Sequence, residues 1–150
     1  MPKDNTIKER EIILNKYGKH CAYCGCEITL KTMQVDHLKP IVRTRVYIGN
    51  NKYKSTGCLF PQDDTLENKM PSCRLCNYHK HTYNLEEFRN EVEKKVDRIM
   101  NSNMRLLLQY GLIAIKPERT VIFYFEKCAE NNSPPMDKEN LVHLNVDNGI

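Results

Sequence analysis

Tryptophan is absent from this chain of 150 residues, and aromatic side chains make up only 8% of it. With so few rings, a large pocket for an organic cofactor is not expected. No apolar run approaches the ~20 residues that a membrane-spanning helix requires, and the N-terminal segment MPKDNTIKEREII is too highly charged to be a secretory signal. We therefore expect a soluble, intracellular, cytoplasmic protein that does not contact a membrane.

The composition also argues against a disordered or fibrous chain, because 40% of the residues are hydrophobic and 28% are charged. A chain of this length buries roughly 68–70% of its unfolded surface in one core. The net charge of +4 is unevenly distributed, since residues 31–60 carry six lysines and arginines against one acid, Asp36. Nucleic acid is the natural partner of such a segment, because each neutralised phosphate releases counterions. A solvated basic loop is the alternative interpretation.

Seven cysteines in a chain without an export signal indicate thiolate chemistry rather than a disulfide framework. Cys21 and Cys24, and again Cys73 and Cys76, are separated by two residues, a spacing that lets two thiolates reach one tetrahedral ion from a tight turn. The sequence therefore predicts structural Zn²⁺ bound by these four cysteines, with Cys26 as a competitor of Cys24. The other cysteines are expected to be buried as small apolar side chains: Cys26, Cys58 and Cys128.

Local patterns predict an α+β fold. A capping-box pattern and helical spacing predict a helix over 6–17, and alternation predicts short strands between 26 and 42, the best of them at 33–38. Residues 43–67 are expected to form a long loop with one strand near 57–60. Further helices are expected over the following segments: 77–82, from Asn84 to 99, and 104–110.

The C-terminal part is expected to add a β-hairpin and a tail. The apolar runs 113–115 and 121–125 flank Lys-Pro-Glu-Arg, a pattern that favours two strands joined by a turn. A linker begins at Asn131, where Asn-Asn-Ser-Pro-Pro follows, and residues 137–150 are expected to form a tail of weak order.

Between the cysteine pairs the chain contains Val35-Asp36-His37-Leu38-Lys39-Pro40, and Asn68 begins a run that continues through the second pair to Lys80. The ordered set C-x-x-C, D-H-x-x-P and N-x-x-P-x-C-x-x-C-N-x-x-K resembles the HNH endonucleases, or ββα-metal nucleases, in the form framed by two zinc knuckles. The likeness covers about half the chain and leaves out 111–150. It implies a zinc-framed ββα-metal core over 21–90 in a single nuclease domain, 1–130, with flanking helices and a C-terminal tail over 131–150.

This resemblance implies metal-dependent hydrolysis of phosphodiester bonds in double-stranded DNA, an activity common in phages and mobile elements. Such hydrolysis needs a base, a cation, and a group that orients the base. His37 is the predicted general base, because imidazole titrates nearest neutral pH. By resemblance Asp36 is a ligand of Mg²⁺ or Mn²⁺. Because neighbours on a strand point to opposite faces, that joint role requires a strand end before Pro40.

The remaining predicted site residues follow from the same resemblance. Asn68 matches the asparagine that orients the base, and Asn77 stands where the family has its second metal ligand. His79 and His81 remain alternatives as metal ligands or phosphate contacts. The residues expected to contact nucleic-acid phosphates are basic: Arg43, Arg45, Lys52, Lys54 and Lys80.

Two other functions fit parts of the pattern. A zinc-stabilised module that binds nucleic acid without cleaving it would keep the cysteines and the basic segment, but it would gain nothing from Asp36 beside His37. A structural zinc protein would use 84–110 and 111–130 as a contact surface. One departure from the family pattern concerns the long interval from His37 to Asn68, where Gly49-Asn50-Asn51 replaces the usual Gly-Gly pair. We interpret this interval as an insertion that sets substrate choice.

Overall fold

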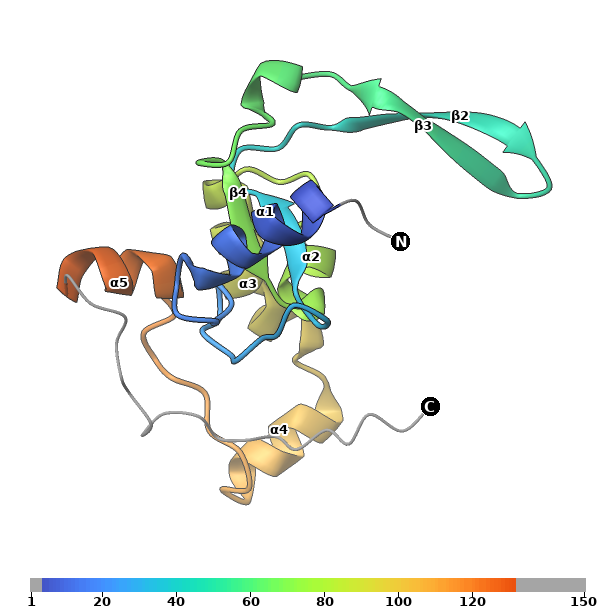
Figure 1. The fold of residues 1–150 in the computed structure, drawn as a ribbon. Coiled ribbons are helices and arrows are strands. Elements are labelled where there is room, and N and C mark those ends of the chain that lie inside the picture. The colour runs from blue at the N-terminus through green and yellow to red at the C-terminus, as the bar shows by residue number, and fades with distance from the viewer. Residues whose placement is uncertain (1–3, 132–150) are drawn as a thin grey trace.

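The computed structural model describes residues 4–131, so all of the tail predicted over 131–150 except Asn131, which ends a helix, lies outside the described residues. Helices and antiparallel strands occupy separate segments, and the α+β class is confirmed. None of the helices within 4–131 is both long and apolar enough to cross a membrane. The elements run in this order (Figure 1): α1 (Asp4–Asn15), β1 (Gln34–His37), β2 (Arg43–Gly49), β3 (Lys52–Cys58), a 3₁₀ helix η1 (Pro61–Asp63), β4 (Lys69–Ser72), α2 (Arg74–Lys80), α3 (Leu85–Ile99), α4 (Ser102–Gln109) and α5 (Tyr124–Asn131).

The centre of the molecule is a two-stranded sheet whose strands are distant in sequence. β1 pairs antiparallel with β4, with Val35 opposite Pro71 and His37 opposite Lys69. α1 contacts β4, and α2 follows β4 directly and contacts β1. The two strands and α2 therefore form a ββα unit. The chain between β1 and β4 runs out of this unit and returns to it at the start of β4.

The core gathers under this unit. Its aromatic centre is Tyr23, whose ring meets Phe88 and Phe123 edge-on at centroid distances of 5.5 Å. Lys16 at the end of α1 donates hydrogen bonds to the carbonyl oxygens of Leu66 (2.5 Å) and Lys69 (2.7 Å), which fixes the chain as it enters β4. The buried apolar cluster comprises Ile13, Leu14, Cys21, Ala22, Tyr23, Ile28, Met33, Met70, Phe88 and Phe123.

The segment predicted as a long loop is instead a β-hairpin, so that prediction is wrong. β2 and β3 pair over seven residues each and extend away from the rest of the molecule (Figure 1). Gly49 pairs with Lys52 across the two-residue turn Asn50-Asn51, and both asparagines have positive φ, 50° and 55°. This geometry is a type I′ turn, in which asparagine tolerates the left-handed conformation. The Gly-Asn-Asn signal was therefore that of a tight turn between strands.

The helices of the middle segment match the prediction closely. α3 begins after Asn84, whose side chain accepts a hydrogen bond from the Glu87 amide while Glu87 caps the Asn84 amide, a complete capping box. α4 follows a second asparagine cap at Asn101. α2 starts three residues earlier than expected, because the Cys73 sulfur caps its first turn.

The predicted C-terminal hairpin is wrong. The backbone amides of Tyr124 and Phe125 donate to the carbonyls of Tyr23 and Ala22 (3.0 and 2.9 Å) instead of pairing with 113–115. α5 then starts at Tyr124, and Glu126 forms an ion pair with Arg89 of α3 at 2.5 Å. Long-range pairing with the first cysteine turn thus overrides the strand propensity of residues 121–125.

Candidate functional site

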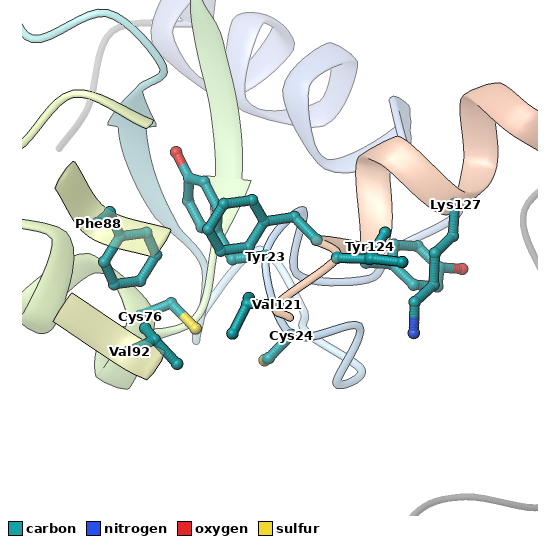
Figure 2. A pocket seen from close by; sticks show the side chains of 10 residues that line it. Tyr23, Cys24, Cys76, Phe88, Val92, Val121, Tyr124 and Lys127 are labelled. Carbon is teal, nitrogen blue, oxygen red and sulfur yellow. The ribbon is translucent and has the colours of Figure 1, made fainter. Parts of the chain in front are cut away.

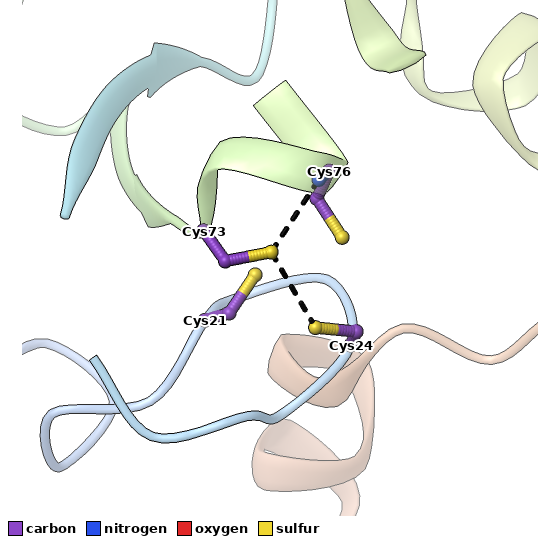
Figure 3. A group of neighbouring side chains, drawn as sticks. All are labelled: Cys21, Cys24, Cys73 and Cys76. Atoms are coloured by element: carbon purple, nitrogen blue, oxygen red, sulfur yellow. Dashed lines mark hydrogen bonds between the residues drawn. The ribbon is translucent and has the colours of Figure 1, made fainter. Parts of the chain in front are cut away.

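The two cysteine pairs converge on one point, as Figure 3 shows. The sulfurs of Cys21, Cys24, Cys73 and Cys76 all lie within 4.8 Å of one another, and those of Cys24 and Cys73 are 3.8 Å apart. A tetrahedral zinc site with Zn–S bonds of about 2.3 Å has sulfur–sulfur edges of about 3.8 Å. The donor set and spacing therefore suit Zn²⁺. Cys26 is outside this group of four and packs against the apolar core, which favours Cys24 over Cys26 as the zinc ligand.

Local structure explains how each pair is presented. The Cys73 sulfur accepts a hydrogen bond from the Cys76 amide at the start of α2. On the other side the Gly25 amide donates to the Cys21 carbonyl (2.9 Å), and Gly25 has a φ of +77°. A Cβ at Gly25 would lie 2.7 Å from the Tyr124 ring. Both the positive φ and the lack of space for a side chain therefore require glycine at this position. Hydrogen bonds from neighbouring thiols, that of Cys24 first, hold the pKa of the Cys21 thiol well below its usual value. Hydrogen bonds with Cys21 in turn raise the pKa of the Cys24 and Cys76 thiols, so the protons of this group are shared among its members.

A pocket of about 250 Å³ lies beside the cysteine group, where the C-terminal segment crosses it (Figure 2). Its walls are mostly apolar, with Tyr23, Phe88 and Val92 on one side and the segment from Val121 on the other. Catalytic pockets combine apolar walls with several converging polar groups. Among the lining residues in the described part of the chain, Lys127 is the one charged side chain, which is too few for a catalytic pocket of that kind.

Asp36 lies at the end of β1 in the interior, with a fractional exposure of 7%. Its Oδ2 accepts a hydrogen bond from the Tyr23 hydroxyl and pairs with Lys80 Nζ at 3.1 Å. Among the described residues no group donates a hydrogen bond to Oδ1, so that oxygen keeps its lone pairs. Burial, followed by the charge of Asp36, raises the pKa of Tyr23 far above its usual value, and the phenol therefore remains a donor.

Lys80 does not lie on the solvent face of α2, so the prediction that it contacts a nucleic-acid phosphate is wrong. Its side chain is fully buried, and Nζ donates to the carbonyl oxygen of His37 at 2.6 Å besides pairing with Asp36. The reason is tertiary packing, since α2 contacts β1 and Lys80 lies on the side of the helix that faces Asp36 and His37. It acts as an internal cation.

His37 has a partner that the sequence did not reveal. Its Nε2 lies 2.9 Å from Oδ1 of Asp64, and Lys69 Nζ lies 3.0 Å from the same oxygen. Because a carboxylate only accepts hydrogen bonds, Nε2 carries a proton, and Nδ1 of the neutral ring is left as the acceptor. Hydrogen bonds from His37 first, then from Lys69, lower the pKa of the Asp64 carboxyl, which is therefore ionised at neutral pH.

Asn68 directly precedes β4, and its carbonyl oxygen accepts a hydrogen bond from the Leu38 amide (2.9 Å), but its side chain is not directed at the His37 ring. Its Nδ2 donates to the carbonyls of Lys39 (2.8 Å) and Asp63 (2.7 Å), and its Oδ1 accepts from the Lys39 amide (2.8 Å). The amide group thus clamps together the two ends of the segment that carries the hairpin. No hydrogen bond joins it to the His37 ring within residues 4–131, where Asp64 has the contact that was expected of Asn68.

The other predicted ligands lie on or just after α2. Asn77 is half-buried and precedes Lys80 by three residues, so the two occupy neighbouring positions on one side of α2. The His79 ring packs against Tyr78 at a centroid distance of 5.3 Å. His81 ends the helix with a φ of +49° and bonds to Thr82. Of the three, Asn77 is the one that shares a side of the helix with Lys80, the residue that pairs with Asp36.

Sequence reasoning missed Asp64, Lys69 and Tyr23. Asp64 falls in the segment 43–67 that was predicted as a long loop, and its contact with His37 depends on the return of β4 beside β1. A charged pair flanking Asn68, with Asp64 before it and Lys69 after it, was the one available signal. Tyr23 lies inside the first C-x-x-C pair, where nothing in the spacing marks a buried phenol.

The chain matches no protein-family model and none of the curated proteins. One solved structure to which it is similar is the type II-C Cas9 enzyme from Actinomyces naeslundii, with a TM-score of 0.40 and 20% identity. The match covers 73% of this chain and 11% of that enzyme, so this chain spans about a tenth of its length.

Proposed function

We propose that this chain is a metal-dependent endonuclease of the ββα-metal (HNH) class that hydrolyses DNA phosphodiester bonds inside the cell. Residues 1–130 would be its single domain, built around 21–90. The observation that carries the proposal is the His37–Asp64 pair, which lies beside buried Asp36 at the end of β1. A protein that only bound nucleic acid would have no use for a histidine whose free ring nitrogen is set by a carboxylate.

In this proposal His37 takes a proton from water at Nδ1, while Asp64 holds the ring and stabilises the imidazolium that forms. Asp64 is a positioning residue, and Lys69 keeps it ionised and in place. The four cysteines hold structural Zn²⁺, which contributes folding free energy to a site built from short strands.

Asp36 and Asn77 are the residues proposed to hold the catalytic Mg²⁺ or Mn²⁺. Both offer oxygen atoms, the ligands that these cations prefer, and Mg²⁺ sites commonly combine one or two carboxylates with substrate phosphates. When bound, the cation would neutralise charge on the phosphate. The unpartnered Oδ1 of Asp36 supports the assignment, and Lys80 neutralises part of the charge through Oδ2.

The test is cleavage of supercoiled plasmid with Mg²⁺ or Mn²⁺, beside an EDTA control. We expect His37→Ala to lower the rate by about 10²–10⁴-fold, the usual contribution of a general base, and His20→Ala to have little effect. Cutting by His37→Ala at the parent rate would overturn the assignment of the base. A zinc-loaded chain that binds DNA but cuts no plasmid would favour the non-cleaving module.

Asp64 has its own test. We expect Asp64→Asn to reduce kcat by about 10–100-fold with KM nearly unchanged, in the range that supporting residues show. Asp63→Asn is the matched control, because that neighbouring acid pairs with exposed Lys39 instead (2.9 Å). Equal rates for both variants would show that Asp64 has no part in positioning His37.

A further inference from the structure

The β2–β3 hairpin takes no part in the proposed chemistry, although it contains 14 strand residues. Every residue of β3 except Cys58 is exposed, and in β2 only Thr44 and Gly49 are half-buried. Figure 1 shows it reaching away from the other elements. Within the described part of the chain, no other element therefore covers either face of the hairpin.

The charge of this hairpin has one sign. Residues 43–58 contain four cations and no acid. Within residues 4–131 none of these cations forms an ion pair, whereas Arg89, Arg98 and Arg119 do. Unpaired cations on an exposed element are complementary to a polyanion. The four are Arg43, Arg45, Lys52 and Lys54.

Both faces also carry exposed apolar side chains. Tyr47 is opposite Tyr53, with ring centroids 5.3 Å apart and exposed fractions of 55% and 64%. Arg45 shares their face, because it precedes Tyr47 by two residues. On the other face Lys54 is opposite Val46, which is 53% exposed. This mixture of cations and exposed apolar groups is unsuited to water alone, and it matches a surface of phosphates and base edges.

The size and shape of the hairpin suit one groove of DNA. Two strands about 4.8 Å apart and seven residues long form a ribbon of about 23 Å. The major groove is about 12 Å wide and admits a two-stranded ribbon, whereas the minor groove is only about 6 Å wide in undeformed B-DNA. Register shifts at Thr44/Arg45 and at Tyr47/Gly49 add local twist, which helps a ribbon follow a helical groove.

The hairpin is also fixed relative to His37. Just outside the two strands, the backbone amide of Leu59 donates to the carbonyl of Val42 (3.0 Å), and that of Phe60 donates to the carbonyl of Ile41 (3.3 Å). The two segments therefore stay paired beyond the base of the hairpin. Below them the Asn68 clamp joins Lys39 to Asp63. β2 starts six residues after His37, and β3 leads through η1 to Asp64. A duplex held by the hairpin is thereby held relative to the catalytic base.

We propose that the β2–β3 hairpin lies in the major groove of double-stranded DNA and selects where the His37 site cuts, an inference that rests on the proposed function. Arginines on the ribbon bind phosphates or the O6 and N7 atoms of guanine, and lysines bind phosphates. Val46 and the Tyr47–Tyr53 pair contact thymine methyl groups and sugars. Target choice thus resides in residues 43–58.

The first test measures binding of zinc-loaded full-length His37→Ala protein to a 30-bp duplex of mixed sequence in Ca²⁺ buffer. We expect added Arg45→Ala/Lys54→Ala to raise Kd about 10-fold and to lower the salt slope, log K against log[salt], by about 1.8, since each phosphate contact contributes about 0.9. The matched control is Lys94→Ala/Lys127→Ala, which removes two exposed cations from α3 and α5. Equal Kd values for the two double variants would overturn the proposal.

The second test identifies the groove. We expect glucosylated 5-hydroxymethylcytosine, which fills the major groove, to weaken binding of the parent and to have little effect on the Arg45→Ala/Lys54→Ala variant. Netropsin in the minor groove should leave binding intact. The opposite pattern would overturn the proposal, as would tighter binding to single-stranded RNA or a hairpin-dependent dimer in light scattering without DNA.

Failure of this inference differs from failure of the proposed function. If the hairpin variants lose groove-dependent binding but the parent never cuts plasmid, the ribbon is supported and the nuclease is not. If the parent cuts plasmid and Arg45→Ala/Lys54→Ala cuts the same sites at the same rate, the nuclease is supported and the ribbon is overturned. Thermal unfolding should be the same in every hairpin variant, because the substituted side chains are exposed.

Discussion

The ammonium group of Lys80 lies 3.1 Å from Oδ2 of Asp36, and both side chains are buried. Lys80 also donates to the His37 carbonyl, so one side chain of α2 holds two consecutive residues of β1. The ion pair therefore fixes the end of the strand at which the proposed base and the proposed metal ligand meet. Removing either charge alone leaves the other buried without its counter-ion.

We predict that Lys80→Met destabilises the fold by about 3–5 kcal/mol, the usual cost of breaking a buried pair on one side. Urea unfolding monitored by circular dichroism measures this change. The double variant Lys80→Met/Asp36→Asn should lose much less than the two single losses combined. Lys94→Met, at an exposed position of α3, should stay within about 0.5 kcal/mol of the parent. Additive losses would contradict direct pairing.

The cysteine group leads to a prediction about metal content. Purified protein should contain one zinc per chain, and Cys73→Ser should lose both the zinc and the cooperative unfolding transition, because structural zinc supplies folding free energy. Elemental analysis and thermal unfolding check this. Cys58→Ser, on β3 and outside the four-sulfur group, should keep the metal. Zinc retained by Cys73→Ser at the parent stoichiometry would rule out the proposed ligand set.

Tyr23 predicts how stability changes in alkaline solution. Its folded pKa is raised above the usual 10.0 by burial and then by Asp36, so above pH 10 the unfolded chain loses a proton that the folded chain keeps. The free energy of unfolding should therefore be fully retained below pH 10 and fall above it by about 1.4 kcal/mol per pH unit. Unfolding between pH 8.5 and 11 should show a slope shallower by that amount in Tyr23→Phe. Tyr53→Phe, exposed on the hairpin, should behave as the parent does.

Asn68 predicts a local effect. Asn68→Ala removes three hydrogen bonds between the clamp and the backbone of Lys39 and Asp63, so we expect a loss of about 1–3 kcal/mol and faster hydrogen exchange over 39–60. Exchange mass spectrometry resolves this segment from the rest. Asn90→Ala, exposed on α3, serves as the control. Unchanged exchange over 39–60 would mean that the clamp does not hold the hairpin.

Features encoded by neighbouring residues were predictable from the sequence. The C-x-x-C pairs, the capping box at Asn84 and the strand ending at His37 each depend on residues a few positions apart. Their positions in the structure agree with that local chemistry. The order of motifs along residues 21–80 was also enough to place Asp36 and His37 at the same strand end.

Features that depend on the return of a distant segment were not predictable. Asp64 meets His37 only because β4 pairs beside β1, and Lys80 is buried only because α2 packs on that sheet. The Val121–Phe125 run has strand propensity, yet its amides bind the carbonyls of Ala22 and Tyr23. In each case a tertiary contact decided between alternatives that the local pattern left equal.

The antiparallel pairing of β1 with β4 has a consequence for how such a protein can vary. The two strands and the cysteine group hold together the two ends of the segment that connects β1 to β4. The length of this segment therefore affects the free energy of unfolding only through the entropy of loop closure, which costs about 0.6 kcal/mol for each doubling of length. Hairpins of other lengths and sequences can therefore be grafted between Ile41 and Phe60 at small thermodynamic cost. Recognition and hydrolysis would then be separately exchangeable modules of one short chain.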